Sequence, residues 1–234
     1  MVTWMLIFPL DRSGLASTAA SAATVAERVA ATAAARTHRT VAVAAIPTAA
    51  YDRAEGGAVA TGVADGLAWG VGVIPVPIDR YWRAINDDAA KPAWTDLAYV
   101  ELLAGQPCGP ARTMFQYLDV DVLSDRWWVV EQRAVAAVAG DVGVRELSWR
   151  SVDPSGRLTP SATAWADRGA PIVSTRGAWW LTDLGDGRTL VEYVAASDAG
   201  GFVPKGVVDR FAVAGVRTTV LAMQKLAEAG PACR

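Results

Sequence analysis

The last thirty residues constrain the fold most strongly, because they form one long amphipathic segment. Residues 200–230 contain one proline, Pro204, in a position that the first turn of a helix accepts, and Gly230-Pro231 ends the segment. The pattern therefore predicts a long C-terminal helix. At about 100° per residue, one face of this helix is apolar. That face carries Val208, Phe211, Ala212, Gly215, Thr219, Ala222, Met223 and Leu226.

The middle of this apolar face consists of small residues, and the larger ones lie toward its ends. Two interpretations remain open. An amphipathic face is usually core, so the helix would pack closely on a sheet. Alternatively, the small residues leave room beneath the helix, which then covers a cavity.

The part of the chain before this helix has the character of strands. β-Branched and aromatic runs alternate with clusters of Gly, Pro, Asp or Ser, and the short connections indicate antiparallel pairing. Gly185-Asp186-Gly187 marks the clearest hairpin, because Asp-Gly accepts the positive φ angles of a tight turn. The predicted strands are residues 69–76, 97–103, 113–122, 127–133, 144–152, 178–184 and 188–196.

A short helix is expected between the first two strands. Asp79 is a plausible N-cap, and Ile78, Trp82 and Ile85 share one face. Gly70 and Gly72 in the preceding strand permit a close approach of another backbone or a bulge. The charged residues of the later strands are expected to form cross-strand pairs on the solvated side of the sheet. These are Glu131, Arg133, Arg145, Glu146, Arg150 and Glu192.

The order of elements predicts an α+β protein with a helix-grip fold, in which a curved antiparallel sheet wraps around the C-terminal helix. Residues 1–60 form an N-terminal extension, either signal-like around residues 4–10 or a helical arm at residues 17–35. Residues 61–234 form the main domain. The arm has few large apolar residues with which to hold a core, so loose docking is expected.

Bulk properties exclude several function classes. The net charge is −2 and no basic stripe is present, so nucleic acid is not an expected partner. No run of 18 apolar residues spans a membrane, and membrane contact is expected to be transient at most. One histidine and two distant cysteines do not make a usual zinc site, and nucleotide-binding and hydrolase motifs are missing from the sequence. We therefore expect no metal, no cofactor and no catalytic residue.

The two cysteines leave the cellular compartment open. Cys108 and Cys233 form a disulfide in an oxidising compartment, or they are two free thiols. A cytoplasmic location is favoured, export stays possible, and a monomer is expected.

Three local patterns resemble the START superfamily, the steroidogenic-acute-regulatory-related lipid transfer domains and their bacterial relatives. Residues 201–205, Gly-Phe-Val-Pro-Lys, are similar to that family's opening of the terminal helix. Residues 124–130 resemble its Arg-Asp-aromatic-Val strand, and residues 76–87 resemble the passage from a strand through a proline into the first helix. The three patterns occur in the family's order across residues 69–229.

This resemblance implies a tunnel between the sheet and the terminal helix that holds one lipid, sterol or polyketide. The positions that match the family imply that Ala212, Thr219 and Met223 of the helix face the tunnel. The helical projection at 100° per residue places Phe211 and Gly215 on the same face. The segment 153–177 corresponds to a lid over the tunnel. The strands are expected to contribute Trp128, Val130, Gln132 and Tyr193.

One feature departs from the family pattern. Several lipid-carrying relatives have a buried carboxylate–guanidinium pair, but this chain has Gln132 at the cation's position and no clear acidic partner in residues 113–122. If Gln116 and Gln132 point inward, they suit a ligand hydroxyl or carbonyl group. Otherwise both are solvated strand residues, since alternate strand residues face outward.

The expected function is to carry or sense a hydrophobic small molecule. The alternative is a cyclase or aromatase acting in the same cavity, with Tyr193 or Arg126 as the first candidate acid or base. A purely structural module is favoured if the chain's own side chains fill the tunnel. The Trp-rich sheet is mostly explained by core packing, and it also suits a flat polycyclic ligand.

Overall fold

The computed structural model describes residues 23–41, 46–120, 124–198, 200 and 205–233, with the backbone alone for 205–212. Its centre is a curved sheet of nine strands, eight of which follow the order β1-β2-β9-β8-β6-β5-β4-β3. All strand pairs are antiparallel except that of β7 with β5. The strands are β1 Ala60–Ala64, β2 Leu67–Ile74, β3 Leu97–Gly105, β4 Ala111–Leu118, β5 Arg126–Val135, β6 Val144–Ser151, β7 Ala170–Pro171, β8 Ser174–Asp183 and β9 Thr189–Asp198.

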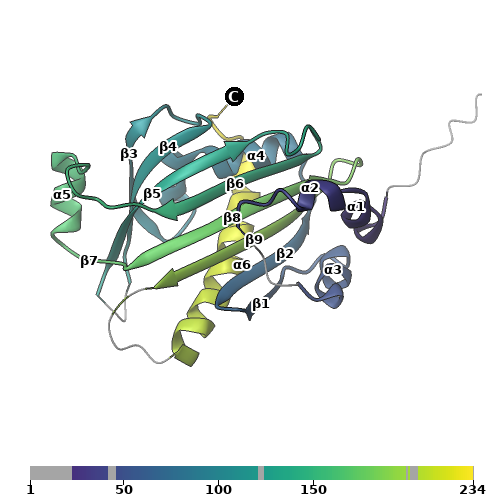
Figure 1. Ribbon diagram of the computed structural model, residues 1–234, viewed down its shortest axis with the longest axis horizontal. Coiled ribbons are helices and arrows are strands. Elements are labelled where there is room, and N and C mark those ends of the chain that lie inside the picture. The colour runs from purple at the N-terminus through teal and green to yellow at the C-terminus, as the bar shows by residue number, and fades with distance from the viewer. Residues whose placement is uncertain (1–22, 42–45, 121–123, 199, 201–204, 234) are drawn as a thin grey trace, which may run out of the picture.

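The helices lie on both sides of this sheet (Figure 1). The long helix α6 (Lys205–Ala229) crosses behind the sheet, and we call the face that it covers the inner face. The expected helix-grip fold is confirmed. The remaining helices are α1 Val25–Ala31, α2 Ala33–Arg36, α3 Thr48–Glu55, α4 Ile78–Asn86, the 3₁₀ helix η1 Asp88–Ala93, and α5 Pro160–Ala166.

The grip of α6 on the sheet depends on a glycine in β2. A Cβ atom added at Gly70 would lie 2.5 Å from Cγ1 of Val216, so a larger residue there would push the helix away. Val216 and Val220 are buried, and α6 contacts β1, β2, β9 and α4. The close approach predicted at Gly70 is therefore confirmed, but a side chain makes it rather than another backbone. The predicted helix start at Pro204 lies outside the described residues.

All seven predicted strands form, with shifted ends. β4 begins at Ala111 rather than at residue 113, and β8 begins at Ser174 rather than at residue 178. The predicted hairpin between β8 and β9 forms, with φ of 82° at Gly185 and at Gly187. Asp186 has no positive φ, so the connection is not the two-residue primed turn expected of an Asp-Gly pair. Two strands were missed, because β1 contains a glycine and no alternating pattern and β7 has only two residues.

Helix α4 differs from its prediction in its start and in its packing. It begins after Pro77, and Asp79 lies in the first turn rather than at the N-cap. Tyr81, not Trp82, is its central buried side chain, since Ile78, Tyr81 and Ile85 are all buried and Trp82 is only partly covered. The hydroxyl of Tyr81 donates a hydrogen bond of 3.1 Å to the carbonyl oxygen of Val220, which ties α4 to α6.

The N-terminal arm, α1 to α3, packs on the opposite, outer face of the sheet, over its β2 and β9 side (Figure 1). Glu192 on β9 is 1% exposed and accepts hydrogen bonds from Arg36 at 3.0 and 2.8 Å, from Arg39 at 2.8 Å and from the Tyr51 hydroxyl at 2.7 Å. Burial alone would raise the pKa of Glu192, but Arg39 and Arg36 lower this pKa by more. Glu192 therefore stays charged beneath the arm.

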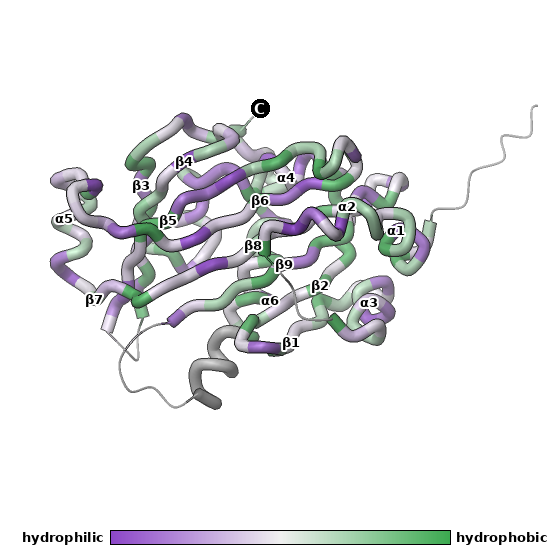
Figure 2. The backbone as a smooth tube through the Cα atoms, in the orientation of Figure 1, coloured by the Kyte–Doolittle hydropathy of each residue, from purple (hydrophilic) through white to green (hydrophobic). Residues whose placement is uncertain are grey.

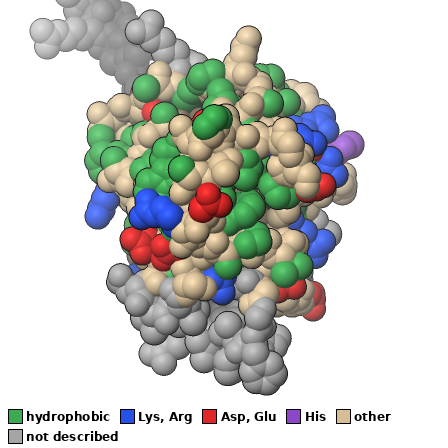
Figure 3. All heavy atoms as spheres, turned by 90° about the vertical axis from the view of Figure 1, so that its left-hand side faces the viewer, with side chains coloured by type: hydrophobic (Ala, Val, Ile, Leu, Met, Phe, Trp, Pro, Cys, Tyr) green, Lys and Arg blue, Asp and Glu red, His purple; other side chains and the backbone are tan. Residues whose placement is uncertain are grey.

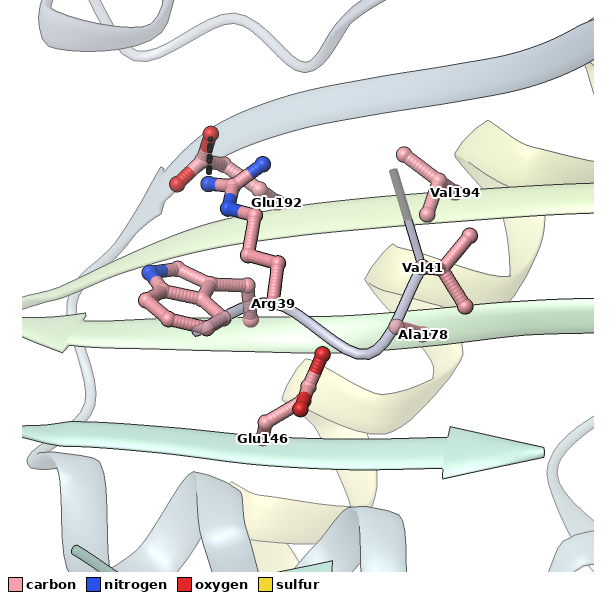
Figure 4. A pocket seen from close by; sticks show the side chains of 7 residues that line it. Arg39, Val41, Glu146, Ala178, Glu192 and Val194 are labelled. Atoms are coloured by element: carbon pink, nitrogen blue, oxygen red, sulfur yellow. Dashed lines mark hydrogen bonds and ion pairs between the residues drawn. The ribbon is translucent and has the colours of Figure 1, made fainter. Parts of the chain in front are cut away.

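A second buried carboxylate holds the same arm. Glu146 on β6 accepts hydrogen bonds from the backbone N–H and the hydroxyl of Thr40, at 2.8 and 2.7 Å. Figure 4 shows Arg39 and Val41 of the arm lying over Glu146, Glu192 and their neighbours on the strands, and the guanidinium of Arg39 lies 4.7 Å from the ring centre of Trp180. The arm is therefore held by these polar contacts together with the buried apolar residues Val25, Ala50 and Ala54, and the expected loose docking is corrected.

These contacts correct the expected cross-strand pairing. Glu146 and Glu192 are not solvated, because the arm covers the outer face at β6, β8 and β9. Arg145 lies on the inner face and reaches Asp79 of α4. The expected kind of pair does form where the outer face is open, between Arg150 and Glu131 at 2.9 Å. Figure 2 shows hydrophilic stretches along this open part of β5 and β6.

The two cysteines form a disulfide. Cys108 lies in the loop between β3 and β4, Cys233 follows α6, and their Cα atoms are 5.7 Å apart. The alternative of two free thiols does not describe this structure. No helix in the described part of the chain is long and apolar enough to cross a membrane.

Replacing Glu192 with Gln should destabilise the protein strongly, because two buried guanidinium groups lose their counter-charge. Loss of one partner of a buried ion pair costs about 3–5 kcal/mol. Glu131→Gln is the matched control, since its exposed pair with Arg150 contributes at most about 1 kcal/mol. Urea unfolding of both variants at pH 7 measures the two effects, and equal losses would contradict the buried role of Glu192.

Candidate functional site

An aromatic wall covers the middle of the inner face. It consists of Trp128 on β5, Trp149 on β6, Trp179 on β8 and Tyr193 on β9. The ring of Tyr193 lies 5.5 Å from that of Trp149 and 4.4 Å from that of Trp179, measured between ring centres. Trp128, Trp149 and Tyr193 remain partly exposed, although β6 and β9 are interior strands of the sheet. Part of the inner face is therefore left uncovered.

The helix α6 offers space on the side next to its grip. A Cβ atom at Gly215 would have no described side chain or strand atom within 4 Å, whereas the adjacent Val216 is pressed against Gly70. Thr219 is partly exposed, and Met223, nearer the C-terminal end, is buried. The close-packing interpretation of α6 therefore holds on the side of Val216, and the cavity interpretation stays a prediction for the side of Gly215. The side chains of Phe211 and Ala212, also predicted contacts, lie outside the described residues.

A buried charge cluster lies at one end of this inner face, beneath α4 and η1. Arg112 on β4, whose side chain is fully buried, donates through Nε to the carboxylate of Asp88 at 2.5 Å. Lys91 also pairs with Asp88. Burial alone would raise the pKa of Asp88, but Lys91 and Arg112 lower this pKa by more, so the carboxylate stays charged.

Two polar atoms in this cluster have no partner among the described residues. They are Nη2 of Arg112 and Oε1 of Gln132, both buried, on side chains that lie directly opposite each other on β4 and β5. The neighbouring nitrogen of Arg112, Nη1, already has partners, since it donates to Gly109 at 2.8 Å and to Asn86 at 3.1 Å. A buried polar group without a partner costs free energy. One donor beside one acceptor suits a hydroxyl group, which accepts and donates.

This cluster corrects the expectation that no buried carboxylate–guanidinium pair exists. The predicted strand began at residue 113 and left out Arg112. Extending the inward alternation of Gln116 and Met114 by one step would have placed Arg112 on the inner face. No pattern in the sequence links Asp88 to that strand.

The two glutamines are both buried, so their solvated alternative is wrong. Gln116 is 9% exposed and Gln132 is 6% exposed. Oε1 of Gln116 accepts a hydrogen bond of 2.7 Å from Nε1 of Trp128, which fixes the indole on the inner face. Val130 lies between Trp128 and Gln132 on β5 and is buried opposite Met114. The four predicted strand residues therefore share one face.

The segment expected to be a lid is instead anchored on the outer face. Within it, α5 packs against Phe115 and Tyr117, whose side chains point away from α6. Trp165 stacks on Tyr99 with ring centres 5.0 Å apart, and Thr159 donates to Glu101 at 2.7 Å. The molecule is seen from this end in Figure 3, where hydrophobic side chains lie among scattered charged ones. These contacts give α5 a fixed position away from the inner face.

The two residues considered for cyclase chemistry do not lie together. Arg126 donates to the carbonyl oxygen of Ser124 at 2.6 Å at the start of β5, and Tyr193 is on β9, with β6 and β8 between them. Strands about 4.8 Å apart place the two backbones about 14 Å apart. Burial raises the pKa of Tyr193, which keeps its phenol protonated near neutral pH.

Comparison with known proteins shows which solved structures share this architecture. No protein-family model matches the sequence, and no curated protein is significantly similar to it. Among solved structures, a STAR-related lipid transfer protein fragment from Xanthomonas axonopodis is 16% identical, with a TM-score of 0.56 over 73% of this chain and 98% of that one. Human STARD10 is 13% identical, with a TM-score of 0.56 over 81% and 83%. Human StAR-related lipid transfer protein 5 is 13% identical, with a TM-score of 0.58 over 89% and 97%.

The protein has the START-type fold. The resemblance seen in the three sequence patterns is confirmed at this level. Since all these identities are low, the similarity concerns the fold, and the ligand has to be argued from the residues of this chain.

The stability contributed by Asp88 should depend on pH. Its folded-state pKa lies below the ordinary value of 3.8, so the contribution is present above that value and is lost as the pH falls through the folded-state pKa. Asp88→Asn should therefore cost about 3 kcal/mol at pH 7 and progressively less below about pH 4. Urea unfolding of both proteins from pH 7 to pH 2.5 measures this difference. A constant difference would argue against a charged Asp88.

Proposed function

We propose that this START-type protein binds one hydrophobic small molecule between the inner face of its sheet and α6, and carries or senses it. The observation that supports this most is the partial exposure of Trp128, Trp149 and Tyr193 on interior strands, together with the open space at Gly215. Exposed aromatic surface in a sheltered site favours an apolar occupant. We assign this role to residues 61–234, and the described part of the extension 1–60, residues 23–41 and 46–60, stabilises the outer face.

The polar cluster indicates which end of the ligand is polar. Cys233 and Ala232, just beyond the C-terminal end of α6, lie beside the loop and helix end that frame Arg112. A ligand hydroxyl or carbonyl would therefore lie toward that end of α6, against Arg112 and Gln132. The apolar body would extend along the aromatic wall. A lipid or sterol with one neutral polar group fits these requirements, and a flat ring system suits the stacked aromatic rings.

Gly215→Trp should block the site without unfolding the sheet, because the indole would occupy open space. We expect native mass spectrometry and organic extraction to find bound lipid or sterol on the wild-type protein and at least 10-fold less on the variant. Ala214→Trp is the matched control, since residue 214 is exposed on the other side of α6. Equal occupancy in the wild type and Gly215→Trp would count against this site. A ligand-free wild type that also takes up no fluorescent sterol would favour the structural alternative.

Gln132→Leu should weaken binding of a ligand with a hydroxyl group, because the acceptor opposite Arg112 is lost. One hydrogen bond contributes about 0.5–1.5 kcal/mol, so about 2- to 10-fold weaker binding is expected. Titration of the variant with a fluorescent sterol and with its deoxy analogue separates the polar contact from the packing. The deoxy analogue should bind both proteins equally. If both ligands weaken alike, Gln132 acts on packing alone.

A further inference from the structure

The disulfide joins the two segments that frame the polar cluster. Cys108 is next to Gly109, whose carbonyl oxygen accepts the 2.8 Å hydrogen bond from Arg112 Nη1. On the other side, the residue before Cys233 is Ala232, whose backbone N–H donates to the Asp87 carboxylate at 2.7 Å. Cys108 is therefore one residue away from a hydrogen bond into the cluster, and Cys233 is one residue away from a hydrogen bond to Asp87, the neighbour of Asp88.

Little else in the described structure fastens the chain end beyond α6. Arg80 donates to the carbonyl oxygen of Glu228 at 3.0 Å, but this contact is exposed. The loop carrying Cys108 is exposed at residues 104–108, and Cys108 itself has a positive φ of 59°, which a non-glycine residue adopts rarely. The covalent bond thus holds together two segments that have few other contacts.

We propose that the Cys108–Cys233 disulfide is a redox latch on the ligand site, so that its reduction speeds ligand release. This inference rests on the proposed function. Reduction frees the chain after α6 from the loop at Gly109. Movement of this loop weakens the hydrogen bond from Arg112 to the carbonyl oxygen of Gly109, while Asp88 and Asn86 still hold the guanidinium. The donor for the ligand's polar group is then less fixed, and the end of the site next to α6 opens.

The chemistry needs a dithiol reductant. A thiolate attacks the sulfur of Cys108, which is exposed whereas Cys233 is buried, and the Cys233 sulfur leaves as a thiolate and takes up a proton. The second thiol of the reductant then displaces Cys108 from the mixed disulfide. Two electrons and two protons pass to the protein, which gains two thiols, and the dithiol becomes a disulfide.

Stopped-flow dissociation of two fluorescent probes, cis-parinaric acid and dehydroergosterol, tests the latch on the full chain. After treatment with dithiothreitol, wild-type protein should release a bound probe at least 5-fold faster than the oxidised protein does. The double variant Cys108→Ser, Cys233→Ser should show the fast rate with or without the reductant. An unchanged rate in wild-type protein with two free thiols by thiol counting would overturn the proposal.

Hydrogen exchange keeps the latch testable if neither probe binds or if the double variant fails to fold. Reduction of wild-type protein should raise amide exchange in residues 106–112 and 226–233, but not in β8 and β9. Equal exchange in both redox states overturns the latch even when probes bind. If exchange rises while no probe binds the oxidised protein, the latch stands as a conformational device and the proposed function is what fails.

Discussion

The contact between Gly70 of β2 and Val216 of α6 determines the layout of the whole molecule. Because that contact draws α6 onto β1, β2 and β9, the helix makes most of its sheet contacts with these three strands. The inner face is closed unevenly: Trp128, Trp149 and Tyr193 remain partly exposed, whereas Met114, Gln116 and Val130 are buried. Beside the grip, a Cβ atom added at Gly215 has no described side chain or strand atom within 4 Å.

Buried charge stabilises both faces of this sheet in similar ways. On the outer face Glu192 meets two arginines of the arm, and on the inner face Asp88 meets Arg112 and Lys91. In each case the cations keep the carboxylate ionised despite burial. The two clusters differ in how their polar atoms are hydrogen-bonded. Both oxygens of Glu192 have partners, while Arg112 and Gln132 each keep a buried atom without a partner in the described structure. The outer cluster also keeps one donor without a described partner, Nε of Arg39, but the inner cluster keeps a donor beside an acceptor. That pairing is the one that suits a hydroxyl group.

The sequence predicted the fold well because its signals are local. Alternating strands, the Gly185-Asp186-Gly187 turn and the amphipathic C-terminal segment each depend on neighbouring residues. Contacts between distant segments were not predictable in the same way. Glu192 looked like a solvated strand residue because nothing near it in sequence reveals the arm. Arg112 was missed because a strand boundary was misplaced by two residues, and the lid was misplaced because Tyr99 and Trp165 stack across 66 positions of sequence.

The disulfide also has a geometric consequence for what the protein can hold. In an open sheet, β3 and β4 can move away from the strands that contact α6, which widens the space between the sheet and the helix. Cys108 lies between β3 and β4, and Cys233 follows α6. Their bond therefore fixes the separation of these two parts of the molecule at that end, with Cα atoms 5.7 Å apart. For the proposed ligand, this fixed separation would limit the size of its polar end.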